Sequence, residues 1–135
     1  MTARGVIGII AGIATLSGLL FAMERLVDAM SGTTGGAPFM RNAPAMVLWL
    51  LWEAVSVAAG GFVTAWIARR HAARHAVVMG TVQAVMTLAA MFSVRDGGSP
   101  LWFWLVGIAS MPPAAWVGGR VNAGRRSSPA SGLPS

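Results

Sequence analysis

The segment AMVLWLLWEAVSVAAGGFVTAWI, residues 45–67, decides the fold of this chain. At 1.5 Å of helix per residue, it is long enough to cross a hydrocarbon core of about 30 Å. It contains one ionisable side chain, Glu53, in an otherwise apolar run. The segment therefore predicts a membrane-spanning helix that carries a carboxyl group.

The composition of the whole chain agrees with this prediction. Of the 135 residues, 56% are hydrophobic and only 10% are charged, whereas a soluble domain has about 25% charged residues. A soluble protein is therefore excluded. The chain has no cysteine, which excludes disulfides, cysteine-based metal sites and thiol catalysis.

Four apolar runs are each long enough to span a bilayer. They predict an all-α membrane protein in which four transmembrane helices form a bundle within residues 1–126. The tail, residues 127–135, has the composition of a disordered end. The first run offers no A-x-A cleavage site, so we expect it to be retained. The predicted helices cover residues 6–23, 45–67, 76–94 and 101–121.

All ten basic residues are arginines, and most of them lie at one predicted side of the membrane. The positive-inside rule therefore places both termini in the cytoplasm. The arginine-only, alanine- and glycine-rich composition indicates a GC-rich bacterial genome, and we expect the protein in a bacterial cytoplasmic (inner) membrane. We expect the partners to be anionic lipid headgroups of the bilayer, with a homo-oligomer left open, and no nucleic acid. The arginines on the cytoplasmic side are Arg4, Arg69, Arg70, Arg74, Arg120, Arg125 and Arg126.

A short repeat joins the second and fourth runs. GGFVTAWIARR, residues 60–70, and GGRVNAGRR, residues 118–126, share GG-x-V-x-A followed by two arginines. Two tandem αα-hairpins would explain the match. Independent selection of small residues near a helix end explains it equally well.

Each run has a stripe of small residues at helical spacing, which is typical of helix contacts in membranes. We expect Gly8, Gly12, Gly60 and Gly118 to lie at these contacts. Glu53 shares the stripe of the second run with Ser56 and Thr64. The other stripes are Gly5, Gly8, Gly12, Thr15, Gly18 and Ala22 in the first run, Gly80, Gln83, Thr87 and Ala90 in the third, and Gly107, Ser110, Ala114 and Gly118 in the fourth.

Glu53 is the main candidate for function, because inserting a charge into a membrane helix costs about 3 kcal/mol. The candidate polar site consists of Glu53, Gln83, Ser56 and Thr64. One hypothesis is a structural role, called a strut below, in which the protonated carboxyl group of Glu53 joins helices by a hydrogen bond to Gln83, Ser56 or a backbone carbonyl. The alternatives are a site that handles protons or cations and a site that binds substrate.

Pro112 and Pro113 lie inside the fourth run and predict a helix kink, because they remove two N–H donors. The kink can fit the helix around the bundle, or the freed carbonyls can coordinate an ion. The tryptophans lie near the expected interfaces, where an aromatic belt explains them and ligand stacking is the alternative. These tryptophans are Trp49, Trp66, Trp102 and Trp104.

No catalytic, cofactor or metal site is expected. His71 and His75 have i,i+4 spacing, but the basic linker around them offers no third ligand. Nucleotide-binding, hydrolase and zinc-protease motifs are absent from the sequence. The chain is therefore not expected to be an enzyme.

Three segments resemble a group of small, uncharacterised bacterial four-helix integral membrane proteins. They are FAMERL (residues 21–26), WEAVSVAAGGFVTAWIARR (residues 52–70) and SPLWFWLVGIASMPPAAWVGGRV (residues 99–121). The resemblance covers nearly the whole chain and implies the same four-helix topology, with no established activity. The residues of this sequence that match the recurrent pattern of that group are Glu24, Trp52, residues 60–63, Pro100, Trp102, Phe103, Pro113 and Gly118. Ser99 stands where members often have a histidine.

Two functions follow from these predictions. The first is a non-enzymatic structural or accessory bundle. The second is a small proton- or cation-coupled transporter that uses Glu53 inside the membrane. Small multidrug exporters are similar in size and helix number, but their essential acid lies in the first helix, which here has no acid before Glu24.

Overall fold

The structure, a computed structural model, describes residues 3–32, 42–69, 71–93 and 99–127. These residues form four helices and no strand: α1 (Ala3–Ser31), α2 (Ala43–Ala68), α3 (Ala72–Ser93) and α4 (Leu101–Ser127). All four are long and apolar enough to cross a membrane. The prediction of an all-α, four-helix membrane bundle is confirmed.

The helices extend beyond the predicted spans. α1 ends at Ser31 and not at residue 23, α3 begins at Ala72 and not at residue 76, and α4 ends at Ser127 and not at residue 121. Hydropathy marks only the part of a helix inside the hydrocarbon core, whereas the backbone hydrogen bonds continue through polar residues beyond it. Residues 33–41 lie outside the described residues, as do residues 128–135, which are all but the first residue of the expected tail.

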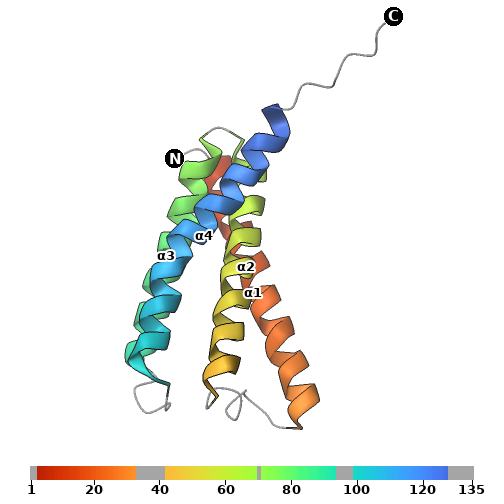
Figure 1. Ribbon diagram of the computed structural model, residues 1–135. Coiled ribbons are helices and arrows are strands. Elements are labelled where there is room, and N and C mark those ends of the chain that lie inside the picture. The colour runs from red at the N-terminus through yellow and green to blue at the C-terminus, as the bar shows by residue number, and fades with distance from the viewer. Residues whose placement is uncertain (1–2, 33–41, 70, 94–98, 128–135) are drawn as a thin grey trace, which may run out of the picture.

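Successive helices run antiparallel, and both termini lie at the same end (Figure 1). We call this the arginine-rich end, because it holds Arg4 of α1, Arg69 directly after α2, Arg74 of α3, and Arg120 and Arg125 of α4. We call the other end the distal end. α2 packs against the three other helices, whereas α1 and α4 hardly meet. The α1–α2 and α3–α4 pairs lie together near the termini and diverge toward the distal end (Figure 1).

The outward surface of the bundle is apolar. Large hydrophobic side chains on every helix are exposed, among them Ile10 on α1 (62%) and Leu51 on α2 (61%). Soluble proteins rarely expose apolar surface on this scale. The surface is therefore suited to lipid, and the chain is a multi-pass membrane protein.

The core lies where the four helices meet. Fully buried side chains come from each helix: Leu16 from α1, Val57 from α2, Met79 from α3, and Met111 and Ala115 from α4. The core is narrow because small residues let the backbones approach closely around it.

One of these close approaches joins α1 to α2. A Cβ atom added at Gly12 would lie 2.6 Å from the carbonyl oxygen of Gly60, and one added at Gly60 would lie 2.6 Å from the carbonyl oxygen of Gly12. A Cβ at Gly8 would lie 2.9 Å from the carbonyl oxygen of Thr64. Only glycine allows the two backbones to come this close.

Similar approaches join α4 to its neighbours. A Cβ at Gly118 would overlap the carbonyl oxygen of Ala58 on α2. A Cβ at Gly80 of α3 would lie 2.9 Å from the carbonyl oxygen of Met111 and 3.2 Å from Cα of Pro112. All four glycines predicted at helix contacts are therefore placed there.

The close packing does not extend along the whole bundle. The predicted stripe of α1 continues to Gly18, yet a Cβ at Gly18 would meet nothing within 4 Å outside its own helix. Ala90, at the distal end of the α3 stripe, is exposed. The bundle is thus held by backbone contacts in its arginine-rich half and is looser in its distal half.

We predict that Gly12→Ala lowers the free energy of unfolding by about 1–3 kcal/mol, because the new methyl group must push α1 away from α2. Gly18→Ala is the matched control in the same helix. It should be neutral or stabilise by up to about 1 kcal/mol, because alanine favours helix without meeting a neighbour. Thermal unfolding in detergent, followed by circular dichroism, measures both. Equal effects of the two variants would contradict the packing described above.

Candidate functional site

α2 is oriented by two contacts with α1. The indole Nε1–H of Trp52 donates a hydrogen bond to the carbonyl oxygen of Leu19 (3.2 Å), and Gly60 lies against Gly12. Neighbouring side chains on a helix point about 100° apart. With Trp52 turned toward α1, Glu53 is turned toward α4.

Glu53 lines a cleft in the described part of the chain with a volume of about 240 Å³. α2 contributes Trp49 and Glu53, α3 contributes Thr87, and α4 together with Ser99, which precedes it, contributes the rest of the wall. The residues of this wall are Ser99, Phe103, Trp104 and Gly107. We call this the Glu53 cleft.

Gly107 makes room for the carboxyl group. A Cβ atom at Gly107 would lie 3.1 Å from Oε2 of Glu53 and 3.4 Å from Cδ2 of Leu50. A larger side chain at this position would occupy space that the carboxylate and the cleft now share. Gly107 is buried and belongs to the stripe predicted in the fourth run.

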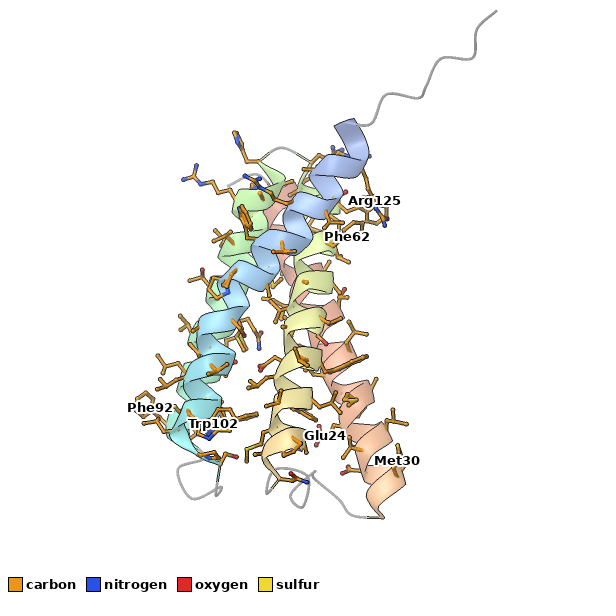
Figure 2. All side chains as sticks on the ribbon, in the orientation of Figure 1. Glu24, Met30, Phe62, Phe92, Trp102 and Arg125 are labelled. Atoms are coloured by element: carbon orange, nitrogen blue, oxygen red, sulfur yellow. The ribbon has the colours of Figure 1, made fainter. Side chains whose placement is uncertain are left out.

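Aromatic rings form a large part of the wall. Phe103 is nearly buried, at 7% exposure, and meets the ring of Trp104 edge to face at a centroid distance of 6.2 Å. Trp102 also meets the ring of Phe103 edge to face, at a centroid distance of 6.1 Å, but is 43% exposed and outside the cleft wall. Figure 2 shows Trp102 near the distal end of α4. Trp49 and Trp104 thus combine a belt position with a place beside Glu53.

The Glu53 carboxyl group has no hydrogen bond or ion pair with any residue that the structure describes. The nearby hydroxyl of Thr87 donates to Sδ of Met111 at 3.8 Å. The side chain is half-buried. It is therefore placed in a cleft without a polar partner from the described helices, which differs from the arrangement that a strut requires.

The other residues of the predicted polar site do not form hydrogen bonds with Glu53. The hydroxyl of Ser56 donates to the carbonyl oxygen of Trp52 (2.8 Å), and that of Thr64 donates to the carbonyl oxygen of Gly60 (2.9 Å). Both side chains are fully buried. Gln83 is half-buried and is not part of the cleft wall, where Thr87 stands one turn away. The hydrogen bonds from Glu53 to Gln83 or Ser56, which one of the hypotheses required, are not formed among the described residues.

α4 continues as one helix through Pro112 and Pro113. Pro112 and the residue before it lie against Gly80 of α3. Pro112 therefore lies at a close contact between helices, Pro113 is exposed, and neither belongs to the wall of the Glu53 cleft. Ion coordination by freed carbonyls stays a prediction.

The arginine-rich end has its own polar features. Arg4, Trp66, Ile67 and Arg69 line a second hollow of about 250 Å³. The guanidinium of Arg120 lies 4.4 Å from the ring centre of Trp116, and that of Arg125 lies 5.6 Å from the ring centre of Phe62 (Figure 2). Such stacking holds arginines near an apolar surface while they remain hydrated.

His71 and His75 fit a structural role. The ring of His75 packs on Gly5, where an added Cβ would lie 2.7 Å from its Cδ2. Its Nδ1 lies 3.1 Å from the carbonyl oxygen of His71. Among the described residues, no group of three or more histidine, aspartate or glutamate side chains could hold a metal ion.

The sequence contained partial signals for the cleft. Trp49 and Glu53 are spaced i,i+4, as are Phe103 and Gly107, so each pair shares a helix face. Thr87 and Gly107 belong to predicted stripes. The missing information was the rotation and depth of the helices, which decides which faces meet.

The fold and the cleft define a four-helix, multi-pass membrane protein with an acid inside its bundle. Comparison of the chain with protein-family models, curated proteins and solved structures gives no match. The resemblance to small bacterial four-helix membrane proteins therefore stays a prediction.

We predict that Glu53→Met leaves the unfolding midpoint unchanged or raises it, because the carboxyl group has no polar partner in the described bundle and methionine has a similar shape. Removing one member of a buried hydrogen bond would instead cost about 1–3 kcal/mol. Thermal unfolding in detergent distinguishes the two results. Trp52→Phe, which removes the indole hydrogen bond to Leu19, is the positive control and should lower the midpoint. A comparable fall for Glu53→Met would support the strut.

Proposed function

We propose that this protein is a small proton- or cation-coupled membrane transporter in which Glu53 is the exchange site. One observation carries the proposal: an intramembrane carboxyl group lies in a cleft and has no polar partner among the described residues. Holding a charge inside a membrane helix costs about 3 kcal/mol, and such residues mark ion or proton pathways in many membrane proteins.

The exchange follows from the chemistry of a carboxyl group. In its protonated form Glu53 is neutral and compatible with an apolar cleft. When it loses the proton, a cation that enters the cleft can balance its charge. Proton and cation therefore compete for one group, which is the basis of coupled exchange.

The uneven packing of the bundle supports this use. The arginine-rich half is closed by backbone contacts at Gly12, Gly60 and Gly118. The residues that line the cleft belong to the distal halves of α2, α3 and α4, and the two helix pairs diverge toward this end (Figure 1). Movement of one pair against the other around the contact between Gly118 and Ala58 would change access to Glu53, as in transporters in which one structural repeat rocks against another.

The non-enzymatic accessory bundle is the second candidate. The close glycine contacts favour it, because they suit a rigid scaffold as well as a pivot. An accessory bundle needs no function for the Glu53 cleft. The two candidates therefore differ in whether substitution of Glu53 changes proton flux.

Flux measurements test the proposal. The full chain is reconstituted in liposomes that contain a pH-sensitive dye, and an ion gradient is applied. We expect proton flux in the wild type and at least a tenfold lower rate in Glu53→Gln, which cannot ionise. Glu24→Gln is the matched control, because Glu24 lies outside the cleft wall near the distal end of α1 (Figure 2). It should keep the wild-type rate.

Absence of flux in the wild type would exclude the transporter and favour the accessory bundle. Equal flux in the wild type and Glu53→Gln would exclude Glu53 as the exchange site. Circular dichroism and size-exclusion chromatography check that each variant is folded before reconstitution.

We also propose that the protein lies in a bacterial cytoplasmic membrane with its arginine-rich end in the cytoplasm. Arginine near the ends of membrane helices is retained on the cytoplasmic side. The described residues of this end contain six arginines and no aspartate or glutamate. A homo-oligomer stays a prediction.

Reporter fusions measure this orientation. A fluorescent protein fused after residue 135 should be fluorescent in a bacterial host, and alkaline phosphatase fused there should be inactive. Alkaline phosphatase inserted between α1 and α2 should be active, because α1 ends and α2 begins at the distal end. The reverse pattern would show that the arginine-rich end faces outward.

A further inference from the structure

The lining of the Glu53 cleft also specifies a class of ligand, and this inference rests on the proposed function. Charge is the first criterion. Glu53 is the only ionisable side chain among the described residues that line the cleft. One carboxylate without a described counter-charge selects a ligand with one positive charge and disfavours anions.

The aromatic wall favours an organic cation over a metal ion. Hard metal cations take six or more oxygen ligands from carboxylates, carbonyls and water. The described wall offers one carboxylate, the hydroxyls of Thr87 and Ser99, and the rings of Trp49, Phe103 and Trp104. Aromatic faces attract alkylated ammonium groups through their quadrupoles, and rings surrounding a quaternary ammonium are a recurrent binding mode.

The volume limits the size of the ligand. Clefts for drug-sized molecules usually measure about 300–1,000 Å³, and this cleft measures about 240 Å³. A trimethylammonium compound with one small substituent is suited to it, whereas a large dye is not. Gly107 contributes to this volume beside the carboxylate, so it also limits which cations fit.

We propose that the Glu53 cleft binds a small monovalent organic cation of the quaternary ammonium class. The carboxylate of Glu53 balances the charge, and Trp49, Phe103 and Trp104 contact the alkyl groups. Gly107 is a specificity-determining residue, because any side chain there would narrow the cleft next to the charge.

Binding and protonation compete in this proposal. A ligand that requires ionised Glu53 displaces a proton from it. Over the pH range in which the carboxyl group is mostly protonated, the apparent affinity should rise about tenfold per pH unit. At higher pH the affinity should become constant.

The test is isothermal titration calorimetry on the full chain in lipid nanodiscs, with benzyltrimethylammonium as the probe. We expect saturable binding that is at least tenfold weaker in Glu53→Gln and unchanged in Glu24→Gln. Trp49→Leu should weaken binding about 2- to 30-fold, the range expected for a lost cation–π contact. Gly107→Ala should weaken the binding of benzyltrimethylammonium more than the binding of the smaller tetramethylammonium.

A neutral analogue separates charge from shape on the unaltered protein. Choline should bind, whereas 3,3-dimethylbutan-1-ol, which replaces the quaternary nitrogen by carbon, should not. This comparison keeps the proposal testable if Glu53→Gln fails to fold. Equal binding of the two compounds, or unchanged affinity in folded Glu53→Gln, would overturn the proposal.

The outcome is distinguishable from that of the flux experiment. Glu53-dependent proton flux without binding of any of these cations would overturn the quaternary ammonium class and leave the proton site in place. Glu53-dependent cation binding without flux would overturn transport and leave the binding site in place.

Discussion

The arrangement of this bundle depends on the backbone contact between Gly12 of α1 and Gly60 of α2. At each position a Cβ atom would lie 2.6 Å from the opposite carbonyl oxygen. In lipid, helices gain little from burying apolar side chains, so close backbone packing supplies much of the attraction between them. The contact sets the distance and rotation of α2, and α2 in turn touches both other helices.

That rotation determines the surroundings of Glu53. The hydrogen bond from Trp52 to the carbonyl oxygen of Leu19 keeps one face of α2 on α1, so the carboxyl group is directed to α4. Opposite it, Gly107 leaves space instead of a side chain. The small residues of the helix faces thus have two effects. In the arginine-rich half they let the helices join closely, and in the distal half one of them, Gly107, leaves the space beside Glu53 that forms the cleft.

Much of the fold was predictable because it depends on local properties. Apolar length shows four spans, arginine distribution shows that both termini lie on one side, and helical spacing shows the faces that carry Gly8, Gly12, Gly60 and Gly118. The extra turns of α1 and α4 were missed, because hydropathy does not report helix outside the hydrocarbon core. The neighbours of Glu53 were missed for another reason: Ser56 and Thr64 share its stripe, yet their hydroxyls bond to carbonyls of their own helix.

The sequence by itself determined that this is a four-helix membrane protein with one carboxyl group inside a span and small residues on the packing faces. These features follow from composition and from a period of 3.6 residues, which act within single helices. Only the tertiary structure decided that Thr87 and not Gln83 lines the cleft, and that Trp49, Phe103, Trp104 and Gly107 meet around Glu53. The depth and rotation of one helix against another depend on contacts between backbones far apart in the chain, and no single helix specifies them.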